Sequence, residues 1–169
     1  MNFLDLFPTI DLFVLFLFVA ILILHLIFIK KDKLLVDLIA IYVAFALIII
    51  LPIFVPQIQA WLNSHGLFRV FSFAGLSIIL FLVLSHSNIA EFSKKISPTE
   101  FSTSFIYRVG LKGIFATTVI YFLPDYIKNY FGTLINFIFN NFFALIFWFC
   151  LPLLFAFAFK FKTRRGWIE

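Results

Sequence analysis

The sequence is poor in charge and in the residues that build most chemical sites. Asp, Glu, Lys and Arg make up 12% of the 169 residues, about half the share typical of soluble domains, whereas 64% of the residues are hydrophobic. Cys150 is the single cysteine, so the sequence offers no disulfide framework and no cysteine metal site. It also has no His-x-x-x-His spacing and no phosphate-binding glycine loop. We therefore expect no catalytic residue, no metal site and no cofactor.

Long apolar runs are what the sequence has instead. The clearest are Leu12 to Ile29 and Leu34 to Leu51, each eighteen residues long. As a helix each would rise roughly 27 Å, close to the roughly 30 Å of hydrocarbon in a bilayer. Backbone polar groups in lipid can be paired only within a helix or a closed barrel. The runs predict an all-α fold, a polytopic integral membrane helical bundle whose first partner is the lipid bilayer.

The apolar runs predict about five membrane spans in a single transmembrane domain. The spans are expected at residues 10–29, 34–53, 67–84, 106–123 and 137–159. The fourth is the weakest, because Arg108 and Lys112 interrupt its beginning, and an interfacial helix there would leave four spans. Pro152 is expected to kink the last span.

The longest polar stretch, residues 85–104, is predicted to be a cytoplasmic loop. Within it Ile89, Phe92 and Ile96 recur at helical spacing. A short amphipathic helix on the membrane surface and a solvated loop with incidental apolar residues fit this pattern equally.

Basic residues gather on one side of this arrangement. Eleven of the thirteen fall in the turn between the first two runs, in residues 85–112 and in the C-terminal tail: Lys30, Lys31, Lys33, Lys94, Lys95, Arg108, Lys112, Lys160, Lys162, Arg164 and Arg165. Because cytoplasmic loops carry an excess of Lys and Arg, we expect an outside N-terminus and a cytoplasmic C-terminus in a bacterial inner (plasma) membrane. Clustering beside apolar runs also accounts for the net charge of +5, so no nucleic acid partner is expected.

His25 and Asp37 are the ionisable residues that lie well within the first two spans. His25 precedes Lys30 by five residues and Asp37 follows Lys33 by four, so in an antiparallel hairpin both lie roughly 6 to 8 Å below the turn. A facing pair could relay protons or hold a cation. The simpler interpretations are a hydrogen bond that joins the two spans, or pairing of Asp37 with Lys33 on one helix face.

Small and amide side chains mark candidate packing faces. They are Gly75 in the third span, Gly110, Gly113 and Thr117 in the fourth, and Asn136 and Asn140 at the start of the fifth. Small residues let helix backbones approach closely, and amides can form hydrogen bonds between helices. We expect packing within the chain, with a second copy or another membrane protein as the alternative use of these faces. For the two asparagines the alternative is a water-lined path.

One family resemblance spans most of the chain. It is carried by Asp11, the Lys30 to Lys33 turn, Gly110 and Gly113 with Phe122-Leu123-Pro124, and Phe147-Trp148 with Leu151-Pro152 before Arg164-Arg165. In the order of these features the chain resembles the colicin V production protein family of small bacterial membrane proteins. The resemblance implies a multi-pass membrane protein and no catalytic residues.

The sequence favours one functional class without identifying an activity. Because it has few intramembrane charges and no recognisable substrate site, we expect a structural or accessory membrane protein that acts through helix–helix contacts. The alternative is a subunit of a channel or transporter for ions or small solutes, which would use His25, Asp37 and the Asn136/Asn140 face. An enzyme is not expected.

Overall fold

The computed structural model describes residues 9–96 and 101–158, and this part of the chain is helical, without strands. A single 3-10 turn, η2, covers Lys31–Lys33. The α-helices are α1 (Thr9–Phe28), α2 (Leu34–Phe54), α3 (Pro56–Ser64), α4 (Phe68–Ser85), α5 (Asn88–Ile96), α6 (Phe101–Phe122), α7 (Asp125–Lys128), α8 (Thr133–Phe139) and α9 (Phe142–Ala158). The basic tail with Arg164 and Arg165 lies outside the described residues, as do the side chains of Lys94 and Lys95.

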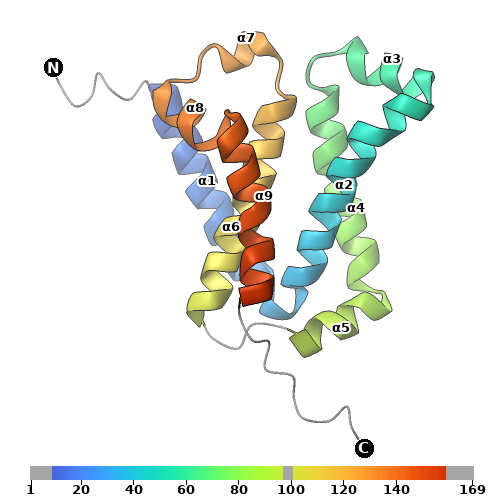
Figure 1. Ribbon diagram of the computed structural model, residues 1–169, viewed down its shortest axis with the longest axis vertical. Coiled ribbons are helices and arrows are strands. Elements are labelled where there is room, and N and C mark those ends of the chain that lie inside the picture. Colours follow the sequence, from blue (N-terminus) through green and yellow to red (C-terminus); the bar gives the residue numbers. More distant parts are fainter. Residues whose placement is uncertain (1–8, 97–100, 159–169) are drawn as a thin grey trace, which may run out of the picture.

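Among the described residues four helices, α1, α2, α4 and α6, are each long and apolar enough to cross a membrane. There are five such segments if α8 and α9, which are bent by 46° at their junction, count as one broken span. Figure 1 shows these segments running alternately between two ends, with α3 and α7 at one end and η2 and α5 at the other. The predicted helical membrane bundle is confirmed, and the fourth span is a continuous helix of 22 residues.

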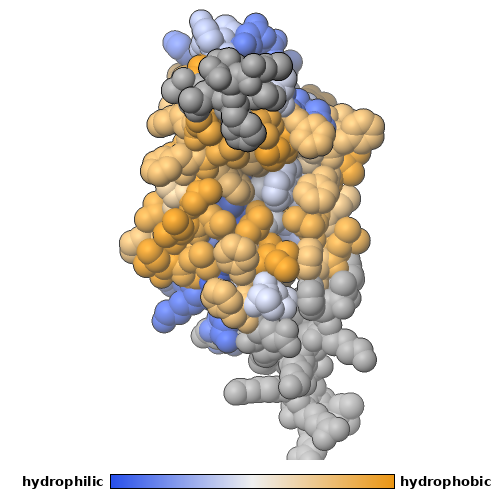
Figure 2. All heavy atoms as spheres, turned by 90° about the vertical axis from the view of Figure 1, so that its left-hand side faces the viewer, coloured by the Kyte–Doolittle hydropathy of each residue, from blue (hydrophilic) through white to orange (hydrophobic). Residues whose placement is uncertain are grey.

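Apolar side chains cover the flank of the bundle. Figure 2 shows a hydrophobic belt between hydrophilic ends on the side where α1 and α8 lie. Phe16 on α1 is 72% exposed and Phe143 on α9 is 82% exposed. Exposing such large apolar side chains costs free energy in water but not in lipid. The surface is therefore that of a multi-pass membrane protein, and its apolar excess faces hydrocarbon.

Helix α6 is the centre of the packing. It contacts α1, α2, α4, α8 and α9, and 56% of its span is buried, against 17% for α1 and 11% for α4. The predicted hairpin of the first two spans is looser than expected. Helices α1 and α2 meet at the η2 turn and then diverge, and α6 packs against both of them (Figure 1).

The last span bends at a different place from the one predicted. The break lies at Asn140 and Asn141, between α8 and α9, whereas Pro152 lies inside α9. The Asn141 side chain accepts a hydrogen bond from the backbone N–H of Ala144 at 2.7 Å, the bond of a helix N-cap. Asn141 therefore starts a new helix here, and its cap satisfies one of the backbone donors that the break exposes.

The segment between the third and fourth spans is more helical than a loop. It forms α5, and α6 begins at Phe101, five residues earlier than predicted. The segment is therefore helical, and it packs on the bundle with Ala90 and Ser93, which are buried, whereas Phe92 is exposed; its placement on the membrane surface stays a prediction. The Ser93 hydroxyl donates to the carbonyl of Asp32, and this bond fixes α5 against the η2 turn.

Candidate functional site

The polar pair expected below the basic turn is present. The η2 turn reverses the chain so that the last turn of α1 faces the first turn of α2. His25 Nε2 lies 3.0 Å from Asp37 Oδ2, and the two residues are 5% and 7% exposed. Asp37 faces protein, as predicted, because the bundle supplies polar partners that lipid would not.

Two further charged side chains reach this pair from α6. Lys112 Nζ lies 3.1 Å from the same Asp37 oxygen, and one Arg108 Nη donates to the backbone carbonyl of His25 at 2.7 Å. Arg108 Nε also points to Ser104 Oγ at 3.5 Å. We call His25, Asp37, Arg108 and Lys112 the ionic cluster. It joins α1, α2 and α6, so three spans are tied together near the basic end of the bundle.

Sequence reasoning missed the part that α6 plays. Arg108 and Lys112 were counted as topology signals, yet Arg108 is 5% exposed and the Lys112 side chain 12%. Their spacing held a usable signal. Ser104, Arg108 and Lys112 are four residues apart and share one face of the helix, which therefore forms a polar stripe inside an apolar bundle.

The ionic cluster contains one ion pair, and the Arg108 guanidinium has a backbone carbonyl in place of a carboxylate partner. The Asp37 carboxylate faces Lys112 directly, and Arg108 binds a carbonyl in the last turn of α1, where the helix dipole is negative. Burying charges is tolerable only when they are paired and hydrogen-bonded in this way. One atom is left over, because His25 Nδ1 is buried without a hydrogen-bond partner among the described residues.

Asp11 forms a second polar joint at the opposite end of α1. Its carboxylate is fully buried and accepts hydrogen bonds from the backbone N–H groups of Gly132, at 2.7 Å, and Ile135, at 3.2 Å. These donors belong to the N-terminus of α8, where orphan N–H groups and the helix dipole favour an anion. The sequence analysis used Asp11 only as part of a family resemblance. In the structure it attaches the broken fifth span to the first.

The small residues of α6 pack as predicted. A Cβ on Gly113 would lie 1.9 Å from the Trp148 ring, and one on Gly110 would lie 3.0 Å from Pro152, so α9 rests directly on the α6 backbone. Thr117 on the same helix is fully buried. Gly75 differs, because a Cβ there would meet nothing within 4 Å among the described residues. Gly75 therefore makes no close helix contact within the described chain, and packing of its face against a second copy or another membrane protein stays a prediction.

Asn136 and Asn140 were predicted to form hydrogen bonds between helices, but their side chains bond locally. Asn140 donates to the side chain of Asn136 at 2.6 Å, and Asn136 donates to the carbonyl of Phe131 at 3.1 Å. Both bonds stay within the segment that contains α8. The Asn136 amide therefore pairs a backbone carbonyl just before α8, and the Asn140 amide pairs that of Asn136. Polar groups left unpaired cost more free energy in lipid than in water.

The ionic cluster can hold three spans in register and can exchange a proton between a histidine and a carboxylate. It has no nucleophile with an adjacent general base, and the described residues include no group of three or more His, Cys, Asp or Glu side chains placed to bind a metal ion. No protein-family model, no curated protein and no solved structure matches the chain. The resemblance to the colicin V production protein family stays a prediction, and function has to be argued from the site itself.

Proposed function

We propose that this chain is a non-enzymatic accessory component of a bacterial inner membrane, which works through helix contacts within the bilayer. The observation that supports this function is the set of hydrogen bonds inside the ionic cluster. Asp37 is bonded to His25 and Lys112, and Arg108 donates to a backbone carbonyl, so each of these side chains is held by protein and only the positive charge of Arg108 lacks a carboxylate partner within the cluster. Such a cluster holds α1, α2 and α6 as a rigid unit that can present its remaining faces to a partner.

The proposed orientation places the N-terminus outside and the C-terminus in the cytoplasm. It rests on the basic residues: among those that the structure describes, Lys30, Lys31, Lys33, Arg108 and Lys112 lie toward the end of the bundle that contains η2 and α5, whereas Arg69 and Lys128 lie at the end with α3 and α7 (Figure 1). The excess of Lys and Arg at one end is the feature by which orientation is set during insertion.

Helix α4 is the face where we expect the partner. Its span is the least buried of the four single-helix spans, and Gly75 leaves its backbone open to close approach. Ile79 lies one turn further along α4 and is 58% exposed. A photo-crosslinking amino acid at Ile79 in living cells should therefore give one adduct of discrete mass with a membrane protein.

The matched control is the same crosslinker at Leu17 on α1, which is 47% exposed. We expect Leu17 to face lipid and to give no protein adduct. Equal patterns from the two positions, whether both are empty or both are smeared, would contradict a partner face on α4.

Ion or proton handling is the second candidate, and a different observation favours it. His25 Nδ1 is buried without a hydrogen-bond partner among the described residues, so one nitrogen of a ring that is bonded to Asp37 is not committed to a structural contact. Ionisable residues within spans commonly mark such pathways. Liposomes that contain the purified chain, loaded with a pH-sensitive dye, decide the matter. A proton flux that is present in the wild type and lost in Asp37→Asn would replace the accessory function by transport.

A further inference from the structure

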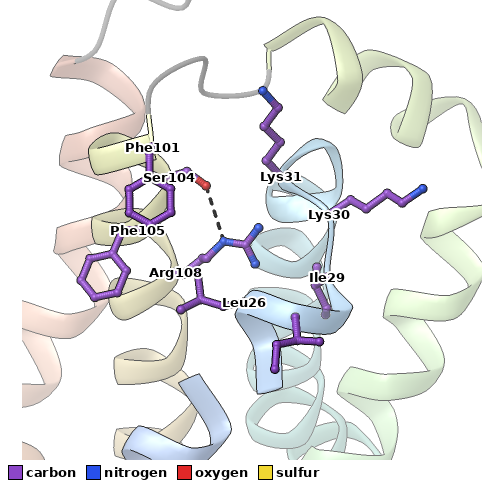
Figure 3. A pocket seen from close by; sticks show the side chains of 9 residues that line it. Leu26, Ile29, Lys30, Lys31, Phe101, Ser104, Phe105 and Arg108 are labelled. Carbon is purple, nitrogen blue, oxygen red and sulfur yellow. Dashed lines mark hydrogen bonds between the residues drawn. The ribbon is translucent and has the colours of Figure 1, made fainter. Parts of the chain in front are cut away.

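A cleft of about 380 Å³ lies beside the ionic cluster, between the end of α1 and the start of α6. It is lined by Leu26, Ile27, Ile29, Lys30, Lys31, Phe101, Ser104, Phe105 and Arg108. Figure 3 shows the Arg108 guanidinium directed from α6 toward the α1–α2 turn, whereas the Lys30 and Lys31 side chains extend from that turn away from Arg108, so their ammonium groups would have to swing round to meet a shared ligand. The volume falls in the range of small-ligand sites in proteins.

The lining is cationic on one side and apolar on the other. Arg108, Lys30 and Lys31 contribute three positive charges, and the lining includes no Asp or Glu. Arg108 is 5% exposed and is held in place by the carbonyl of His25, whereas the two lysines are exposed. A fixed guanidinium with mobile ammonium groups beside it is a combination suited to phosphate, because Arg offers a rigid fork and Lys a point charge.

The position of the cleft selects the source of the phosphate. Arg108 lies seven residues into α6, so it is roughly 10 Å from the start of the helix, near the depth of lipid headgroups at a helix end. Ile27, which is 69% exposed, and Phe105, which is 38% exposed, edge the cleft on the membrane side of the turn lysines, whereas Phe101 lies at the start of α6. A ligand that has both a phosphate and a hydrocarbon chain would therefore fit this cleft, with the phosphate at its cationic side and the hydrocarbon at its apolar side.

We propose that this cleft binds the headgroup of an anionic phospholipid, with the phosphate between Arg108 and the turn lysines. The acyl chains then lie along Ile27 and Phe105, on the membrane side of the turn lysines. Basic residues at the cytoplasmic end of membrane helices attract anionic lipid, and pockets between helices there bind particular headgroups. This site adds a specific lipid ligand to the accessory function and does not depend on which protein partner α4 contacts.

The test is a lipid titration of the full-length chain, purified in a non-ionic detergent and observed by native mass spectrometry. Phosphatidylglycerol and phosphatidylcholine with the same acyl chains are the two probes. We expect a one-to-one adduct with phosphatidylglycerol at a dissociation constant at least about tenfold lower than with phosphatidylcholine. The double variant Lys30→Gln/Lys31→Gln should weaken phosphatidylglycerol binding by about fivefold for each lysine removed.

Lys33→Gln is the matched control, because Lys33 belongs to the same turn but does not line the cleft; its amine lies 6.0 Å from the Phe81 ring centre. Its binding should stay within about twofold of the wild type. Both lysine variants change exposed or half-buried turn residues, so folding is not at risk as it would be for Arg108. A separate arm adds inorganic phosphate at the lipid's concentration, which should displace nothing.

Three results would overturn the site. Equal affinity for the two lipids would show that the headgroup charge is not read. An equal loss in Lys33→Gln would show general surface attraction in place of a cleft. Displacement by inorganic phosphate would identify a soluble anion, not a lipid, as the ligand.

Discussion

The sharpest packing prediction compares one substitution in two spans. Gly75→Ala and Gly113→Ala both place a methyl group on a helix that crosses the membrane, and their surroundings are opposite. At Gly75 the new Cβ meets no described atom within 4 Å, whereas at Gly113 it lies 1.9 Å from Trp148 Cε3. The two variants should therefore change the free energy of unfolding in opposite directions.

The magnitudes follow from two effects. Ala is favoured over Gly in a helix interior by roughly 0.5 to 1 kcal/mol, so Gly75→Ala should stabilise the chain by about that amount. At Gly113 an overpacking cost of about 1 to 3 kcal/mol opposes this gain. The indole cannot simply move aside, because Trp148 Nε1 donates to the carbonyl of Ile138 at 2.8 Å and the ring stacks on Phe139. We expect a net destabilisation of about 1 to 2 kcal/mol.

The measurement is unfolding of the purified chain in mixed micelles with increasing SDS, followed by circular dichroism. The two variants should differ by about 2 kcal/mol or more, with Gly75→Ala above the wild type and Gly113→Ala below it. If Gly113→Ala were as stable as Gly75→Ala, the close contact of α6 and α9 would be refuted.

Two further predictions concern the joints and the orientation. Asp11→Ala removes the acceptor for the Gly132 and Ile135 N–H groups, and should cost about 1 to 2 kcal/mol and speed hydrogen exchange at both amides, whereas unchanged exchange would contradict the cap. For the orientation, Cys150 is first replaced by Ser, and single cysteines are placed at Ser64 and Lys94. A membrane-impermeant thiol reagent added to intact cells should label Ser64→Cys alone, and labelling of both from one side would contradict five spans.

The lengths of the apolar runs, and the depth of a residue below the basic turn, could be predicted from the sequence. Run lengths predicted the spans, and counting residues from the basic turn correctly placed His25 beside Asp37, because both distances are fixed by helix rise. The start of α9 was not predicted, although Asn is a residue that commonly begins a helix, because its side chain can accept a hydrogen bond from the backbone N–H three residues later, as Asn141 does from Ala144.

Packing between distant segments was not predictable in the same way. The local sequence pattern does not predict that α6 packs against both α1 and α2. Nor does it predict that Lys112 forms an ion pair with Asp37, which lies 75 residues earlier in the sequence. From the sequence alone, a basic residue near the start of a span can be assigned equally well to the cytoplasmic surface or to a buried ion pair. The choice is made by the partner that tertiary packing supplies, here a carboxylate on another helix.

The ionic cluster is the centre of this account, and a double-mutant cycle of Asp37→Asn and Lys112→Met tests it most directly. Removing Asp37 alone leaves Lys112 buried without its counter-ion, so it should cost roughly 3 kcal/mol, the lower end of the range for broken buried pairs. The double variant should be more stable than the sum of the single effects predicts, by about 1 to 2 kcal/mol. Asp125→Asn with Lys128→Met is the control, an ion pair of 3.7 Å whose carboxylate is 94% exposed, and should show no measurable coupling. Additive effects at Asp37 and Lys112, like those of the control, would contradict an ion pair that ties α2 to α6.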